Sequence, residues 1–233
     1  MITKPISKIL FFDLETAGVE RDFPSLKKTN IPVAKQFLAY EDWFRKRYPE
    51  DKDLSTDDLF LSKGALLPEF ARIIVASFAF VTPEGEVKKQ TFSNDDEKAL
   101  LTDVKKLLER VSKMDFALCG HNIKLFDIPM LCKRMIINGI KPPSILPSYD
   151  TKPWEIKAID TKDFWQYGNN FSIATLELMC AALGVESSKT GEVTGDKVHD
   201  YYWNKKGLVK IAEYCEKDVD VLVEVLLKLQ KLS

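Results

Sequence analysis

The chain has 233 residues, of which 34 are basic and 35 acidic, and a formal net charge of −1. This balance excludes an overall basic field, so it argues against tight nonspecific binding to nucleic acid, though not against a locally basic groove. Hydrophobic residues make up 45% and charged residues 30% of the chain, as in an ordinary soluble globular protein.

The length, the cysteine spacing and the apolar runs further limit the classes of protein to which the chain can belong. The chain is long enough for one large domain, and we expect a single domain over residues 1–233, with an insertion or flap at 17–65. The cysteines have neither paired nor zinc-finger spacing, so reduced, buried thiols are expected at Cys119, Cys132, Cys180 and Cys215. No stretch approaches membrane-spanning length and the first apolar run is too short for a signal peptide, so we expect a cytoplasmic protein without a membrane partner.

The first apolar run, residues 9–16, ends in two acids and predicts a buried strand. Side chains alternate across a strand, so Asp13 and Glu15 share one face while Phe12 and Leu14 point into a core. Two neighbouring carboxylates repel each other and burial adds a desolvation cost, for which a divalent cation with oxygen ligands is the usual compensation. Alone, the pair is equally compatible with the polar edge of a strand.

Residues 17–65 follow this strand as an insertion, and its start is interrupted by Gly18, Pro24 and Pro32. Residues 33–48 predict an amphipathic helix, with aromatic residues at helical spacing at Phe37, Tyr40 and Phe44. The charge-dense run at 41–53 is compatible with a flap that touches a nucleic-acid strand. We favour a solvated helix at the domain edge, because mixed charge is typical of a solvated face.

Residues 72–92 predict a hairpin, in which strands at 72–81 and 86–92 flank a turn at 83–85. A helix with one apolar stripe follows, capped by Ser93 or Asn94 and running to about residue 112. Residues 116–119 then predict a short buried strand.

A second acidic position, Asp127, stands just ahead of a predicted helix that runs to about Asn138. Aspartate is a preferred N-cap and proline is tolerated in a first turn, so this position alone favours a structural role. We expect Phe126 in the core and His121 in a hydrogen-bonded loop.

Residues 157–160 predict an edge strand, after which a helix is predicted from Ser172 to Leu183, ended by Gly184. Asp160 is either a fifth acid near the site or, as we favour, a cap for the turn into Trp165. In the loop at 189–197, Lys189 and Lys197 either contact phosphates or are solvated.

A last helix is predicted over residues 208–232, with a buried stripe at Ile211, Cys215, Leu222 and Leu226. Tyr214 and Asp218 are four residues apart and hence neighbours on one face. Asp218 lies close to the stripe, where an acid is costly unless it has a partner. The alternative is a surface acid paired with Lys217.

Each motif is weak alone, but their order is specific. A strand D-x-E, an N-x-x-x-F-D at a helix start and a Y-x-x-x-D in the C-terminal helix together resemble the signature of the DEDD superfamily of 3′-5′ exonucleases. The residues that carry this resemblance are Asp13, Glu15, Asn122, Phe126, Asp127, Tyr214 and Asp218. The tyrosine indicates the DEDDy (DnaQ-like) subgroup. The chain is most similar to stand-alone predicted 3′-5′ exonucleases related to the exonuclease domain of family B DNA polymerases.

The resemblance implies an α/β protein with an RNase H-like fold, in which a mixed five-stranded sheet is flanked by helices. It also implies a site for two Mg²⁺ or Mn²⁺ ions. Asp13, Glu15 and Asp218 would hold one ion, and Asp127 would act on a second ion that shares Asp13. Tyr214 would orient the attacking water in a two-metal hydrolysis.

The resemblance further implies a single-stranded substrate that is shortened from its 3′ end to release nucleoside monophosphates. We expect DNA rather than RNA, although the same motifs fit an exoribonuclease or, if activity has decayed, a nucleic-acid-binding module. A separate polymerase or repair protein is a further expected partner. Candidate substrate contacts are Leu14 through its backbone, Thr16 and Asn122, followed by His121, Phe126 and Trp165.

Overall fold

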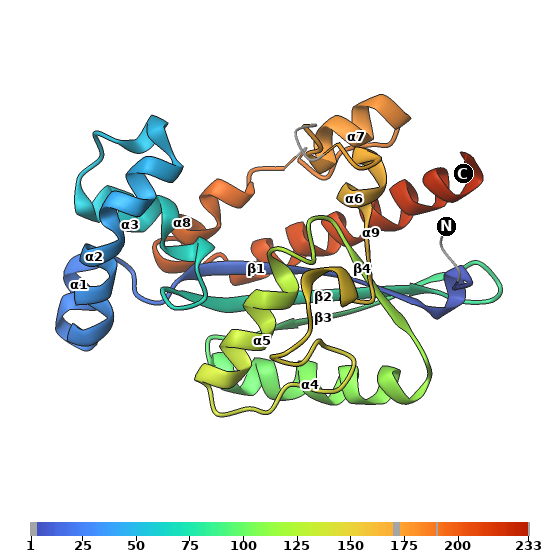
Figure 1. Ribbon diagram of the computed structural model, residues 1–233, viewed down its shortest axis with the longest axis horizontal. Coiled ribbons are helices and arrows are strands. Elements are labelled where there is room, and N and C mark those ends of the chain that lie inside the picture. Colours follow the sequence, from blue (N-terminus) through green and yellow to red (C-terminus); the bar gives the residue numbers. More distant parts are fainter. Residues whose placement is uncertain (1–3, 170–172, 190, 233) are drawn as a thin grey trace.

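The computed structural model describes residues 4–169, 173–189 and 191–232, and its centre is a five-stranded sheet with the strand order β3-β2-β1-β4-β5. The strands are β1 (Ile9–Gly18), β2 (Ala71–Val81), β3 (Val87–Ser93), β4 (Ala117–Gly120) and β5 (Ala158–Asp160). β2 pairs antiparallel with β1 and β3, whereas β4 is parallel to β1 and to β5. The expected mixed five-stranded sheet flanked by helices is confirmed (Figure 1).

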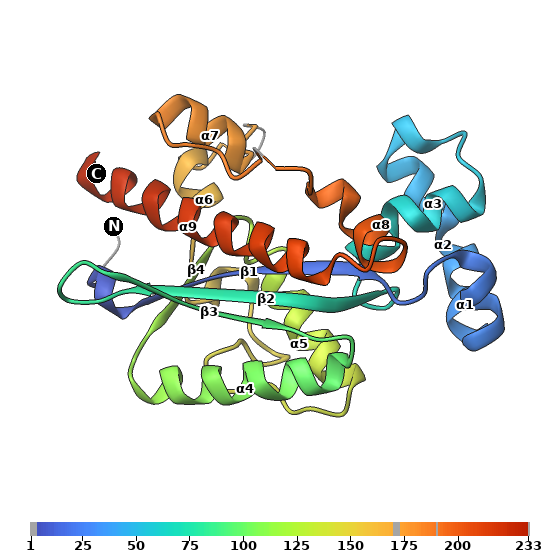
Figure 2. The same ribbon diagram turned by 180° about the vertical axis from the view of Figure 1, so that it is seen from behind.

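Helices cover both faces of the sheet (Figures 1 and 2). α4 (Glu97–Lys113) and α5 (Asp127–Ile137) lie on one face, and the long α9 (Leu208–Leu232) crosses the other. The other α-helices are α1 (Phe23–Thr29), α2 (Ile31–Arg47), α3 (Thr56–Lys63), α6 (Thr161–Gln166), α7 (Leu176–Leu183) and α8 (Val198–Trp203). Short 3₁₀ turns are η1 (Ile6–Lys8), η2 (Pro49–Asp51), η3 (Gly64–Leu66), η4 (Pro153–Glu155) and η5 (Gly195–Lys197). Within the ranges that the structure describes, none of the helices combines the length and the apolar character needed to cross a membrane.

β1 is buried on both faces, which fixes the orientation of its acids. Phe12 and Leu14 pack into the core beneath α4 and α5, as the alternation predicted. Ile9 and Phe11 pack on the opposite side, beneath α9. Because side chains alternate along a strand, Asp13 and Glu15 follow Phe11 on the α9 side. The acids therefore lie under a helix instead of along a solvated edge.

Several predicted element boundaries are wrong by a few residues. The N-cap of α4 is Asp96, whose Oδ1 accepts a hydrogen bond from Ala99 N at 3.1 Å, and neither Ser93 nor Asn94 caps it. Ser93 instead ends β3, where it pairs with Val75. Pro24 and Pro32 stand in the first turns of helices, where the missing N–H costs nothing, so they start α1 and α2 instead of breaking the chain.

The helix expected from Ser172 begins later, at Leu176, with Thr175 as its N-cap. Ser172 itself lies outside the described residues. Gly184 ends α7 with a φ of 63°, as predicted, and α9 has the predicted bounds. All four cysteines are free; Cys119, Cys180 and Cys215 are buried, whereas Cys132 is only partly so.

The insertion after β1 has a core of its own, at one end of the molecule (Figure 1). Phe37 and Phe44 of α2 are fully buried there and pack against further aromatic rings at Phe23, Phe60 and Phe70. The expectation that Tyr40 shares this buried face is wrong, because its side chain is 48% exposed. The helix therefore presents aromatic groups on two sides.

α8 anchors the chain at the point where it leaves β1. His199 Nδ1 accepts a hydrogen bond from Gly18 N at 3.0 Å, and its Nε2 lies 2.9 Å from Arg21 O. This pattern requires the neutral tautomer with the proton on Nε2. A Cβ on residue 18 would stand 2.9 Å from His199 Cε1, so the close approach requires glycine.

The His199 anchor predicts a pH-dependent contribution to stability. Burial lowers the pKa of His199, so its contribution is complete above the unfolded-state pKa of about 6.5 and falls as the pH drops through the window below it. We expect His199→Ala to cost about 1–3 kcal/mol of unfolding free energy at pH 8, because the buried N–H of Gly18 and the partly buried carbonyl of Arg21 lose their partner. Denaturant titrations of variant and wild type at pH 8 and pH 5 should show this cost shrinking at the lower pH. A cost that is equal at both values would contradict a neutral His199.

Candidate active site

β1 places Asp13 and Glu15 beyond its pairing with β4. The parallel pairs end at Phe11 and Cys119, while the antiparallel pairing with β2 continues to Gly18. A bulge in this ladder falls between Glu15 and Thr16. Both acids therefore lie at the end of the sheet where β4 gives way to a turn.

α9 brings a thiol against these carboxylates. Cys215 Sγ lies 3.4 Å from Asp13 Oδ2 and 3.5 Å from the backbone oxygen of the same residue. Ligand atoms of Asp13, Glu15 and Cys215 all lie within 4.8 Å of one another. Since Tyr214 precedes Cys215, the third sequence motif lies directly over the first.

Asp127 joins the same cluster from the other side of the sheet. It is the first residue of α5, 4% exposed, and its Oδ1 accepts a hydrogen bond from Leu14 N at 3.2 Å. The expected N-cap role is wrong, because Phe126 occupies the N-cap position and forms no side-chain bond there. The carboxylate of Asp127 instead ties α5 to β1 between the two acids of the first motif.

Asp218 is a buried acid, so the alternative of a surface acid paired with Lys217 is wrong. It is 8% exposed and accepts hydrogen bonds from the hydroxyl groups of Ser188 and Tyr214. Tyr214, one turn earlier on α9, is also 8% exposed. A hydroxyl donor thus stands next to a carboxylate inside the site.

Burial raises the pKa values of all four carboxylates, and the charges of neighbouring acids raise those of Asp13 and Glu15 further. Burial raises the pKa of Asp13 well above its usual range, and the charges of Asp127, Glu15 and Asp218 raise it further. The pKa of Glu15 rises for the same reasons, first burial and then Asp218 and Asp127. Burial raises the pKa of Asp127 to about 8. Burial also raises the pKa of Asp218, although the hydrogen bonds from Ser188 and Tyr214 lower it in part.

This repulsion is what a bound cation would relieve. Buried, clustered carboxylate oxygens match the ligands preferred by hard divalent ions, and such an ion stabilises the charged form of each acid. The residues present therefore fit a divalent-metal site. Lys189 supplies part of the same compensation, since its charge lowers the pKa of both Glu15 and Asp218, while it is itself ion-paired with Glu177.

The site opens into a cavity of ≈ 390 Å³. Five of the predicted site residues line it, namely Asp13, His121, Asn122, Tyr214 and Asp218. Glu15 and Asp127 are buried behind this surface, and Leu14, Thr16 and Phe126 are not among the lining residues. α7 and the loop that follows it, including Ser188 and Lys189, form the facing wall.

Four of the predicted substrate contacts are engaged with other parts of the chain. Leu14 N donates to Asp127, and Thr16 Oγ1 donates to Ala65 O at 2.9 Å, so both have partners within the chain. Phe126 is partly buried and packs against the core, as expected. Trp165 packs partly buried against the α7–α9 cluster.

Asp160 organises the turn that carries His121 and Asn122. It caps α6 by accepting a hydrogen bond from Lys162 N at 3.0 Å, which confirms the expected cap. It also accepts from Asn122 N at 2.8 Å, in a turn where Asn122 has a φ of 59°. Asn122 Oδ1 accepts from Lys162 Nζ at 3.0 Å, and His121 Nδ1 lies 3.0 Å from Thr161 Oγ1, so the expected hydrogen bond of His121 is confirmed.

Three groups in the site were not predicted from sequence. Ser188, which bonds Asp218, and Lys162, which bonds Asn122, lie in segments without a motif. Cys215 was predicted as a core residue, and nothing in the helical pattern indicates its contact with Asp13. Of the two lysines considered for phosphate contacts, Lys189 lines the cavity, whereas Lys197 is exposed in η5 and does not.

Residues 66–233 match the model of a protein family. The family is described as "Predicted 3'-5' exonuclease related to the exonuclease domain of PolB". The match spans more than two thirds of the chain and includes Asp127, Tyr214 and Asp218. Asp13 and Glu15 precede it. A search of curated proteins gave no match.

Solved structures that match the chain include the following two. The family B DNA polymerase from the hyperthermophilic archaeon Pyrobaculum calidifontis matches with a TM-score of 0.59 and 15% identity, covering 97% of this chain and 25% of that one. Escherichia coli Exonuclease I in complex with a 5cy-dA13 oligonucleotide matches with a TM-score of 0.48 and 13% identity, covering 96% of this chain and 40% of that one. The chain thus spans well under half the length of either protein, and the first likeness shows the fold.

Proposed function

Since the chain belongs to the family of predicted 3′-5′ exonucleases related to the exonuclease domain of PolB, a class of phosphodiester hydrolases, we propose that it shortens single-stranded DNA from the 3′ end by metal-dependent hydrolysis. One observation carries the proposal: Asp127 and Asp218, from two distant parts of the chain, lie close enough to Asp13 and Glu15 for their charges to raise the pKa values of both. In this proposal residues 1–233 act as one exonuclease unit. The products are nucleoside monophosphates.

The acids divide between two Mg²⁺ or Mn²⁺ ions in this proposal. Asp13, Glu15 and Asp218 would hold one ion, and Asp13 with Asp127 would hold the other. Such ions, when bound, stabilise the charge on the attacking and leaving oxygens of an in-line displacement. The carboxylates supply the oxygen ligands that both metals prefer.

Tyr214 holds the attacking water in this proposal. Burial and the neighbouring acids Asp218, Glu15 and Asp13 raise the pKa of Tyr214 far above its usual range, so its hydroxyl keeps its proton. A protonated hydroxyl can position a water by a hydrogen bond but does not act as a base. His121 and Asn122, which line the cavity, are placed to contact the strand.

Tyr214→Phe tests this role. We expect turnover to fall by about 10- to 100-fold, the usual effect of losing a hydrogen bond that orients a group in a metal site. The affinity for Mn²⁺, measured by calorimetry on the folded protein, should change little, because no ligand is removed. A variant with an unchanged rate would exclude Tyr214 from the mechanism.

A nuclease assay tests the proposed function itself. Strands of matched DNA and RNA sequence, labelled at the 5′ end, are incubated with the protein, and products are resolved over time. We expect a ladder that shortens from the 3′ end, stops with a chelator and resumes with Mg²⁺ or Mn²⁺, with DNA cut faster. A preference for RNA identifies an exoribonuclease, and no cleavage of either strand contradicts the proposed activity.

A further inference from the structure

An open groove of ≈ 890 Å³ runs between α2 and the segment at 67–70 that leads into β2. One wall is the outer face of α2, including Ile31, Tyr40 and Trp43, and the other includes Leu67 and Phe70. The α2 wall belongs to the insertion, which lies before the part of the chain that matches the exonuclease family.

The α2 wall carries aromatic rings in reach of solvent. Gln36, Tyr40, Trp43 and Arg47 follow one another at three- and four-residue spacing, so they share one face of the helix. Tyr40 is 48% and Trp43 44% exposed. The core of the insertion uses Phe37 and Phe44, on another face. The Trp43 ring touches this core edge-on, with its centroid 5.2 Å from that of Phe44, and still keeps nearly half of its surface exposed.

Two exposed cations lie along the groove and its continuation on α2. Lys35 lines it and Arg47 continues the aromatic face; both are exposed, and neither forms an ion pair or side-chain hydrogen bond with the described part of the chain. The acid in the lining, Glu69, is ion-paired with Lys133 at 3.0 Å. Half-exposed rings beside unpaired cations are the combination that binds single-stranded nucleic acid through its bases and phosphates.

The groove is connected to the acid cluster through the segment at 64–70, which forms one wall and the turn before it. η3 is bonded to β1 by the contact between Thr16 Oγ1 and Ala65 O, directly after Glu15. The 67–70 wall is bonded to α5, since Arg134 Nη1 donates to Pro68 O at 2.9 Å. α5 begins with Asp127. β1 and α5, which carry three of the four acids, are therefore also bonded to the segment that forms one wall of the groove.

We propose that this groove binds the single strand whose 3′ end lies in the active site, with bases stacked on Tyr40 and Trp43 and phosphates bound by Lys35 and Arg47. The proposal rests on the proposed exonuclease function and adds to it a second contact region. Stacking of this kind accepts any base, so the groove gives affinity without sequence preference. The insertion then acts as a strand guide, and long strands are better substrates than short ones.

Binding is measured first, in the inactive Asp13→Asn background so that the strand is not consumed. Fluorescence anisotropy with a labelled strand of about 20 nucleotides, longer than the usual site of single-strand-binding domains, gives Kd. Tyr40→Ala and Trp43→Ala should each raise Kd at least about fivefold, the lower range for loss of one stacked base. Trp43→Phe, which keeps a ring, should retain most of the affinity.

Trp154→Ala serves as the matched control, because Trp154 is 81% exposed and lies outside the groove. Its Kd should stay at the wild-type value. An equal loss in this control, or wild-type affinity in the doubly substituted Tyr40→Ala/Trp43→Ala protein, would overturn the proposal; in the second case the groove is left for a protein partner.

Turnover of a dinucleotide and of the long strand then separates the two proposals. With Asp13 intact, the double groove variant should lose at least about fivefold in kcat/KM on the long strand and little on the dinucleotide, which is too short to reach a second region. An equal loss on both substrates contradicts the groove. A wild-type protein that shortens neither substrate contradicts the exonuclease function instead.

Discussion

Replacing Asp13 by asparagine is expected to reduce strand hydrolysis by about a thousandfold or more, because loss of a shared metal ligand removes several kcal/mol of transition-state stabilisation. Asparagine has nearly the same size, so the packing beneath α9 is kept. The contact from Cys215 Sγ can also be kept, since an amide oxygen accepts as the carboxylate does. The loss of rate therefore reports on charge at the site.

The same substitution is expected to stabilise the metal-free protein. Burial and the charges of Asp127, Glu15 and Asp218 raise the pKa of Asp13 in the folded state. A carboxyl group with a raised pKa contributes its full stability below the unfolded-state value of about 3.9 and loses it as the pH rises through the folded value. Asp13→Asn removes this loss. Without metal, its free energy of unfolding should therefore exceed that of the wild type most at pH 8, and the difference should vanish towards pH 4.

Divalent metal should make the wild type more stable than Asp13→Asn, the reverse of the order expected without metal. At a concentration of 100 Kd, a bound ion stabilises the wild type by about 2.7 kcal/mol, whereas the variant gains less. Thermal unfolding with chelator and with Mn²⁺ measures both states, and Asp53→Asn, an exposed acid elsewhere, is the control that should match the wild type. Normal turnover by Asp13→Asn, or equal metal stabilisation of variant and wild type, would remove Asp13 from the site.

Elements with a strong period were predictable from the sequence. α9 has the predicted bounds, and its stripe at Ile211, Cys215, Leu222 and Leu226 is buried. The alternation around Phe12 and Leu14 likewise predicted which face of β1 enters the core. These are local signals, in which the pattern itself states which side of the element is apolar.

Boundaries were less predictable, because local signals compete there. Ser93, Asn94 and Asp96 are all good caps, and pairing of Ser93 with Val75 in the sheet decides that α4 starts after Asp96. Tyr40 has the same spacing as its buried neighbours, but the insertion core is filled by other rings, which leaves it at the surface. The deciding contacts are tertiary in both cases.

The position of Asp127 shows the same limit in the candidate site. Local preference indicated an N-cap, whereas its partner in the structure is Leu14 N, 113 residues away along the chain. Ser188 has no local signal at all, although it bonds Asp218. The order of the three motifs identified Asp127 as a candidate site residue. Its burial and its hydrogen bond to β1 could be seen only in the structure.

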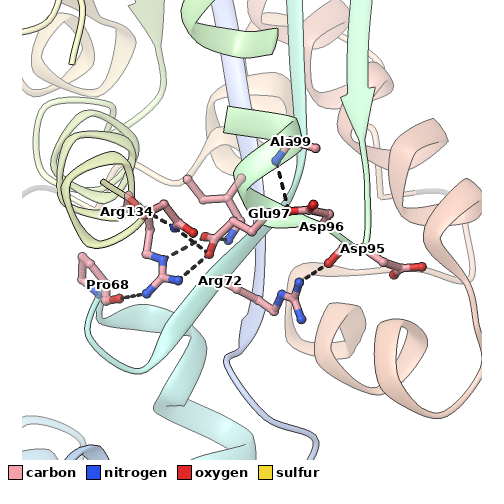
Figure 3. A network of polar contacts seen from close by, with 9 residues as sticks. Pro68, Arg72, Asp95, Asp96, Glu97, Ala99 and Arg134 are labelled. Carbon is pink, nitrogen blue, oxygen red and sulfur yellow. Dashed lines mark hydrogen bonds and ion pairs between the residues drawn. The ribbon is translucent and has the colours of Figure 1, made fainter. Parts of the chain in front are cut away.

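Replacing Arg134 by methionine is expected to cost about 3–5 kcal/mol of unfolding free energy, the usual cost of breaking a buried ion pair from one side. Arg134 is 5% exposed and binds Glu97 with two donors, one of them Nε at 2.8 Å from Oε1 (Figure 3). Glu97 also accepts from Ile73 N at 2.8 Å and Asn138 Nδ2 at 3.0 Å. The pair thus joins β2, α4 and α5, and the variant leaves a buried carboxylate without its cation.

A second substitution separates the unpaired charge from the lost packing. In Arg134→Met/Glu97→Gln the buried charge is gone while an amide oxygen still accepts from Ile73 N, so part of the lost stability should return. The neighbouring exposed pair of Lys133 and Glu69 is the control: Lys133→Met should cost no more than about 1 kcal/mol, as exposed pairs do. Denaturant unfolding of all three proteins gives the comparison. If Arg134→Met costs no more than Lys133→Met, the buried pair does not hold α5 to the sheet, and Asp127 must be positioned by its bond to Leu14 and by apolar packing alone.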